Sequence, residues 1–128
     1  YNEVDPTRSQ GKREDEHIRD FISECKKFAR LHNAVVWTVA HPTKLPKEQD
    51  GSFSPPTSYQ ISGSSHWANM ADVIAVVHRD FDDNTSTIYT RKIREQDLYG
   101  KIGEAKFQYN FRKYRFEPFD VSKYYDFD

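Results

Sequence analysis

The chain has 128 residues, of which 36% are hydrophobic and 30% charged, so it can build one core of ordinary size but hardly two. Its formal net charge of -1 excludes a uniformly basic nucleic-acid-binding arm, so any contact with nucleic acid must come from local patches. The single cysteine excludes an internal disulfide framework and fits a reducing compartment. No apolar stretch reaches the roughly 18 residues of a membrane span.

The N-terminal part of the chain predicts a loop followed by an amphipathic helix. Residues 1–11 are polar, and because the chain opens on Tyr1 instead of methionine, we expect it to be a piece of a longer protein. Residues 12–32 predict the helix, since apolar side chains recur at spacings of three and four. This stripe consists of Ile18, Phe21, Ile22, Cys25, Phe28 and Ala29. We interpret Cys25 as a small core residue and not as a redox group.

A continuous apolar run follows the helix and ends abruptly in polar residues. Residues 34–40 lack polar alternation and therefore predict a strand that is buried on both faces of a sheet. His41 comes directly after it, at the edge where open α/β sheets bind ligands, although a histidine after an arbitrary strand more often begins a loop. Residues 41–62 contain four prolines without periodicity, and they predict a long loop of the kind that is usually functional or mobile.

The second half of the chain predicts a short helix and four strands. The helix covers residues 64–70, with Ser62 or Ser64 as its N-cap. The strands cover 72–79, again apolar and buried from Val73 to Val77, then 85–94, 103–110 and 114–119. The fold class is therefore α/β, with a sheet that is parallel at first and is then extended by antiparallel hairpins. The acidic and aromatic tail, residues 118–128, is expected to be flexible.

The sequence gives little support to the common motifs of nucleotide-binding, metal-binding and nucleophilic sites. None of the five glycines fits the P-loop pattern G-x-x-x-x-G-K-[ST] or the dinucleotide pattern G-x-G-x-x-G. His41, His66 and His78 lack the spacing of a zinc site. Ser64, His41 and Asp72 can be written down as a nucleophilic triad, but nothing in their spacing favours one.

Basic residues mark the ends of three predicted strands. The pairs are His41 with Lys44, His78 with Arg79, and Lys92 with Arg94. In a parallel sheet the first two pairs would share one edge. Lys92 and Arg94 are two residues apart on a strand, so their side chains project to the same side. Two fixed cations suit a polyphosphate, although a solvated surface pair would have the same sequence.

An ordered series of short motifs spans residues 1–117. It consists of Tyr-Asn-Glu-Val-Asp-Pro, Trp-Thr-Val-Ala-His-Pro-Thr-Lys, Ile-Ser-Gly-Ser-Ser-His-Trp-Ala-Asn-Met-Ala-Asp, His-Arg-Asp, Lys-Ile-Arg and Gly-Lys-Ile-Gly. The series resembles the C-terminal half of the RecA-like motor of DnaB-type ring helicases, closest to the Twinkle and phage primase-helicase branch. The resemblance implies a partial RecA-like sheet.

The resemblance implies roles in sensing phosphate and binding DNA. His41 matches the polar residue that senses the γ-phosphate and connects it to the DNA-binding loop. Lys44 and Lys47 would contact the DNA backbone in the central channel. Ser62, Gly63 and Ser64 resemble a second channel-facing element, whose backbone amides can approach phosphates.

Further residues match nucleotide-binding positions of these helicases. Arg79 resembles an arginine near the nucleotide across the subunit boundary, and Tyr109 resembles the aromatic residue that stacks on the base. Lys92 and Arg94 match the cationic pair inserted in trans into the neighbouring site, with Arg94 as the arginine finger. Such fingers can contribute about 10³–10⁵ in rate.

The implied function is that of an ATP-dependent replicative DNA helicase, a homo-hexamer that translocates on single-stranded DNA with ATP and magnesium. Whether the same parent chain also contains a primase domain is left open by the resemblance. We expect a cytoplasmic protein of bacterial or phage origin. The P-loop, the magnesium-binding acid and the catalytic glutamate are absent, so this chain should not hydrolyse ATP by itself. The alternatives are a RecA- or KaiC-like ATPase without unwinding, and a non-catalytic assembly module with the same fold.

Overall fold

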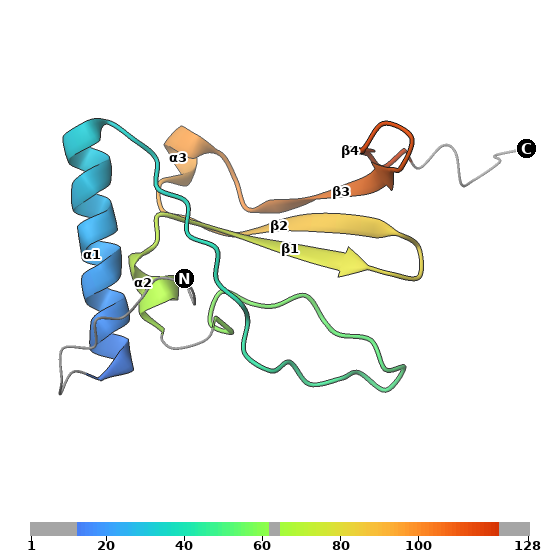
Figure 1. Ribbon diagram of the computed structural model, residues 1–128, viewed down its shortest axis with the longest axis horizontal. Coiled ribbons are helices and arrows are strands. Elements are labelled where there is room, and N and C mark those ends of the chain that lie inside the picture. The colour runs from blue at the N-terminus through green and yellow to red at the C-terminus, as the bar shows by residue number, and fades with distance from the viewer. Residues whose placement is uncertain (1–12, 62–64, 121–128) are drawn as a thin grey trace, which may run out of the picture.

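The computed structural model describes residues 13–61 and 65–120. Its helices and strands are α1 (Glu14–His32), α2 (His66–Met70), β1 (Val73–Asp80), β2 (Thr85–Ile93), α3 (Gln96–Tyr99), β3 (Gly103–Asn110) and β4 (Arg115–Pro118). The strands form one 4-stranded sheet in the order β1-β2-β3-β4, and every neighbouring pair is antiparallel. Figure 1 shows α1 standing at one end of this sheet. The predicted α/β class, the two helices and the four strands after residue 72 are confirmed, and α3 is an addition.

The ends of α1 follow local sequence signals. Three acidic residues lie in its first turn, and Arg30 and His32 lie in its last turn, so the side-chain charges complement the helix dipole. The helix stops at Asn33, which adopts the left-handed conformation with φ 47 and ψ 49. Both termini of α1 are therefore specified by residues next to them in the chain.

The core lies between α1 and α2. Ile18 and Ile22 of α1 pack with Trp67 of α2, and Phe21, Ile61 and Met70 surround this cluster. The second half of the apolar stripe is less covered, since Phe28 is 53% exposed. Cys25 is half-buried, and this burial raises the pKa of its thiol, in keeping with a packing role.

The predicted strand over residues 34–40 is wrong for the described chain. The segment joins no ladder of the sheet, and the side chains of Val35 and Trp37 are 78% and 79% exposed. A strand exists only through hydrogen bonds to a neighbour, and each described strand pairs with the next one along the chain. The apolar run thus has the composition of a buried strand but joins none of the ladders of the described sheet.

The predicted parallel half of the sheet is also not found in the described residues, which contain antiparallel pairs alone. The expectation that β1 is buried on both faces is wrong as well. Exposure alternates along it, with Ile74 buried and Val77 68% exposed. This alternation is typical of an antiparallel strand that is covered on one face.

The long loop predicted over residues 41–62 is confirmed for its described part. Residues 41–61 run outward and fold back on themselves (Figure 1). Isolated bridges join Pro42 to Ile61 and Lys47 to Phe53. These contacts bring the start and end of the loop together, so its tip projects away from α1.

Candidate functional site

Lys92 and Arg94 lie at the end of β2, and both side chains reach the C-terminal end of α2. The ammonium group of Lys92 donates to the carbonyl oxygens of Ala68 at 2.6 Å and Asn69 at 3.1 Å. The Nη2 atom of Arg94 donates to the carbonyls of residues 69–71, at 3.1, 3.1 and 3.4 Å. The predicted projection of both cations to one side is therefore confirmed. Carbonyl groups at a helix C-terminus lack intrahelical partners, so these cations satisfy them.

Asp72, directly before β1, adds a carboxylate to this group. Its Oδ1 atom accepts hydrogen bonds from Lys26 Nζ at 2.8 Å and from Arg94 Nε at 2.9 Å. Partial burial tends to raise the pKa of Asp72, but hydrogen bonds and charges from Lys26 and Arg94 outweigh it and lower the pKa. We call Lys26, Asp72, Lys92 and Arg94 the cation cluster.

The cation cluster has an excess of positive charge, because Lys26 and Arg94 share the Asp72 carboxylate, whereas Lys92 bonds backbone carbonyls of α2. Burial and then the charge of Arg94 lower the pKa of Lys92 from its ordinary value. Because like charges repel across this small space, a bound anion would lower the electrostatic energy of the cluster. The arrangement is therefore suited to contact phosphate oxygens.

Arg79 and Tyr109 lie at the opposite end of the sheet. Arg79 Nη2 donates to Asn84 Oδ1 at 3.1 Å within the β1–β2 turn. The ring of Tyr109 packs edge-on against Phe111 and Phe116, with centroids 5.0 and 5.1 Å apart. The structure therefore brings both predicted nucleotide-binding residues to the same end of the sheet.

The two ends of the sheet are too far apart to share one phosphate group. Arg79 lies opposite Ser86, whereas Lys92 lies opposite Ile74 at the other end of the β1–β2 pair. At the usual rise per residue, the backbones of Arg79 and Arg94 are separated by about 25 Å along the strands. The predicted finger thus lies in a different region of space from Arg79 and Tyr109, the predicted nucleotide-binding residues.

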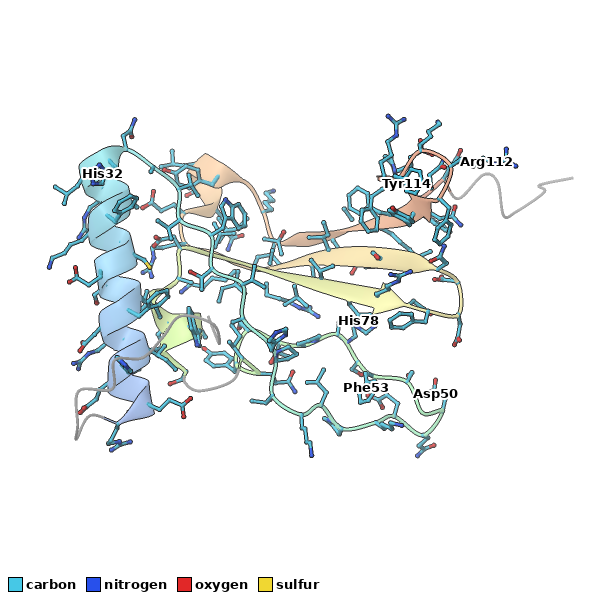
Figure 2. The ribbon with its side chains drawn as sticks, in the orientation of Figure 1. His32, Asp50, Phe53, His78, Arg112 and Tyr114 are labelled. Carbon is cyan, nitrogen blue, oxygen red and sulfur yellow. The ribbon has the colours of Figure 1, made fainter. Side chains whose placement is uncertain are left out.

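The other predicted site residues lie in the long loop. His41 and Lys44 are exposed, and neither makes a hydrogen bond or an ion pair within residues 13–61 and 65–120. A shallow hollow, in which Lys47 Nζ lies 5.7 Å from the centroid of the Phe53 ring, is lined by Pro42, Thr43, Lys44, Leu45, Lys47 and Phe53. Asp50 and Phe53 mark the tip of this loop (Figure 2). Ser62, Gly63 and Ser64, the predicted second channel element, lie outside the described residues.

One predicted juxtaposition of two strand ends is not found in the structure. The strand ends at His41 and His78 were expected to share an edge of a parallel sheet. They do not, because the segment before His41 is not part of the sheet, while His78 lies within β1 (Figure 2). In the described part of the chain, no group of three His, Cys, Asp or Glu side chains could hold a metal ion.

Sequence reasoning did not include Lys26 or Asp72 in this site. The two residues are 46 positions apart, and no local pattern reports their pairing. The position of Asp72 could have been predicted from the sequence, because an acidic residue directly before β1 lies beside the end of β2 in an antiparallel hairpin. The backbone N–H of Arg94 donates to the Asp72 carbonyl at 2.8 Å, which closes this end of the hairpin.

No protein-family model matches the chain. A search of curated proteins finds the Twinkle homolog protein, chloroplastic/mitochondrial, of Arabidopsis thaliana, with 36% identity over 115 residues. The chain is similar to a Twinkle protein. The match covers 86% of this chain and 16% of the relative, so the chain spans about a sixth of the length of the Twinkle homolog. It supports the predicted resemblance to the Twinkle branch.

Two observations bear on the expected location. The Twinkle homolog is a plant protein whose name places it in chloroplasts and mitochondria, so the expected bacterial or phage origin stays a prediction. Among the residues that the structure describes, no helix is long and apolar enough to cross a membrane.

Proposed function

We propose that this chain is part of the RecA-like motor of a Twinkle-type replicative DNA helicase and supplies cations to a nucleotide bound by a neighbouring subunit. The observation that carries this proposal is the placement of Lys92 and Arg94. Both lie at the end of β2, and both side chains donate hydrogen bonds to carbonyls at the C-terminal end of α2. Similarity to the Twinkle homolog over 86% of the chain supports it. ATP and magnesium would be bound mainly by residues outside these 128, since the chain has no P-loop.

The proposed chemistry is electrostatic. In phosphoryl transfer the negative charge is spread over the oxygens of the transferred group, and catalysis consists mostly of positioning and charge stabilisation. Arg94 would stabilise the γ-phosphoryl transition state as the arginine finger, and Lys92 would neutralise a neighbouring oxygen. Because both side chains are held by α2, little reorganisation would be needed when the nucleotide arrives.

A ring explains why the candidate residues lie at two ends of one sheet. One subunit would hold the base of one nucleotide near Tyr109. Its Lys92 and Arg94, at the other end of the sheet, would contact the phosphates of a different nucleotide in the next subunit. Hydrolysis would then depend on assembly, as expected for a homo-hexamer whose finger acts in trans.

The exposed apolar segments support a larger motor domain. Val35, Trp37 and Val77 are 78%, 79% and 68% exposed, which is unusual for residues in extended apolar runs. We infer that residues 34–40 and the free edge of β1 pair with parallel strands of a RecA-like sheet that the rest of the motor supplies, and that other parts of the motor cover their exposed side chains. His41 would then stand at the strand end, between the nucleotide phosphate and the loop.

The long loop would face single-stranded DNA. Lys44 and Lys47 are its two lysines, and both are exposed. Together with Ser62, Gly63 and Ser64 they would contact phosphates without reading bases, so binding should be salt-dependent and sequence-tolerant.

Replacing Lys44 with alanine should weaken the binding of single-stranded DNA to the assembled parent protein. Each lost phosphate contact reduces the slope of log affinity against log salt by about 0.7 for single strands. The measurement is fluorescence anisotropy with two oligonucleotides of different sequence over a series of salt concentrations. Lys27→Ala, at an exposed lysine paired with Glu24 on α1, is the matched control. An unchanged slope for Lys44→Ala would remove Lys44 from the DNA interface.

The experiment that tests the whole proposal compares ATP hydrolysis and unwinding of a forked duplex by the parent protein. Loss of both activities in Arg94→Ala supports a helicase motor. Hydrolysis by the unmodified protein without unwinding would instead favour a RecA- or KaiC-like ATPase. A parent chain without hydrolysis or a P-loop would favour a non-catalytic assembly module.

A further inference from the structure

The guanidinium of Arg94 is held along one side. Its Nε bonds Asp72, and its Nη2 bonds the carbonyls at the end of α2. Its Nη1 makes no hydrogen bond to any residue that the structure describes, and the Arg94 side chain is 45% exposed. A guanidinium is a rigid planar fork of five N–H donors, so fixing one side also fixes the direction of the other. The two Nη1 donors are therefore oriented and available.

Asp72 is itself held in place from the other direction. Lys26 of α1 donates to the same carboxylate oxygen at 2.8 Å and to the carbonyl of Met70 at 3.0 Å. The side chain of Lys26 is 32% exposed, which makes it the less solvated partner of Asp72, compared with 45% for Arg94. The contacts thus run from α1 through Lys26 and Asp72 to Arg94.

We propose that Asp72, held by Lys26, is a positioning residue that orients the free side of Arg94 toward phosphate oxygens of the nucleotide in the neighbouring subunit. This inference rests on the proposed function of Arg94. Asp72 acts through the arginine and does not touch the nucleotide. One carboxylate does not cancel the attraction for an anion, because it pairs with both Lys26 and Arg94, and Lys92 adds a third cation at the end of α2.

A purely structural role for the carboxylate is less well supported by the contacts. The junction between α2 and β1 is tied to β2 by the backbone bond from Arg94 N to the Asp72 carbonyl, 2.8 Å long. That bond survives any change of the Asp72 side chain. Replacing the carboxylate with an amide keeps size and shape, but it removes the charge that two cations share. Asp72→Asn therefore loosens the Arg94 side chain while the backbone geometry stays.

The test is steady-state ATP hydrolysis by the assembled parent protein carrying Asp72→Asn. We expect kcat to fall about 10- to 100-fold, because a misplacement of about 1 Å in a catalytic group can cost that much. The KM for ATP should change less than about twofold, since the P-loop subunit provides most of the ground-state binding. Asp83→Asn is the matched control. Asp83 also pairs with a lysine at 2.8 Å, Lys106, but lies near the β1–β2 turn, and its variant should keep full turnover.

Two further readouts separate positioning from stability. In an Arg94→Ala background, Asp72→Asn should reduce kcat no further, because the two residues act as one unit. Subunits with Asp72→Asn, mixed with P-loop-inactive subunits that carry an intact Arg94, should regain part of their hydrolysis. A merely unstable subunit would not be rescued in this way.

Each outcome distinguishes this inference from the function on which it rests. Normal turnover in Asp72→Asn, together with collapse in Arg94→Ala, overturns the positioning role and leaves the arginine finger intact. An additive loss in the double variant, or a kcat loss that follows a lowered melting temperature, also overturns the positioning role. Normal turnover in Arg94→Ala overturns the proposed function itself.

Discussion

Replacing Arg94 with alanine is expected to lower ATP turnover of the parent protein by about 10³-fold or more, because the transition state loses its trans-acting positive charge. Binding of ATP should change little, since the finger contributes mainly when charge develops on the phosphoryl group. The measurement is kcat and KM for ATP in the presence of single-stranded DNA. Mixing Arg94→Ala subunits with P-loop-inactive subunits should restore part of the activity, because the finger of one supplies the site of the other.

The contacts of Arg94 within its own chain require a matched control for this variant. Its ion pair with Asp72 is 45% and 58% exposed, so losing it should cost no more than about 1 kcal/mol of folding free energy. Arg91, on β2 three residues before Arg94, also donates to a backbone carbonyl, that of Pro56 at 3.2 Å. Arg91→Ala should have a similar effect on stability while turnover stays normal. Equal turnover in the two variants would contradict a catalytic role for Arg94.

The second large effect is expected in the core. Ile18 is 0% exposed and packs against Ile22 and Trp67, so Ile18→Ala should lower the free energy of unfolding by about 2–5 kcal/mol. The loss matters for the cation cluster, because Lys26 reaches Asp72 only while α1 stays docked on α2. Urea unfolding of the 128-residue chain, followed by circular dichroism, provides the measurement.

Ser23→Ala is the control for the core variant. Ser23 lies on the exposed side of α1, and its hydroxyl donates to the carbonyl of Arg19 in the preceding turn. Removing this hydroxyl should change stability by no more than about 0.5 kcal/mol, as is usual for surface positions. If Ile18→Ala had an equally small effect, α1 would not be packed on α2 as described.

The sequence by itself determined the elements whose signals are local. The apolar stripe of α1 and its stop at Asn33 depend on residues within a few turns of each other. The β1–β2 hairpin likewise follows from two strand patterns joined by an Asp- and Asn-rich turn, in which Asn84 adopts a positive φ of 54. The alternation in Lys92-Ile93-Arg94 was sufficient to predict that both cations project to one side.

Only the tertiary structure decided what those elements meet. The apolar run over residues 34–40 predicts burial, but burial depends on a neighbour that no local pattern names, and the described strands pair elsewhere. The cation cluster joins Lys26 to Asp72 across 46 positions. Its geometry exists because α1 docks on α2 and antiparallel pairing returns β2 to the start of β1. Local periodicity reports which way a side chain points, whereas long-range packing decides which charge it faces there.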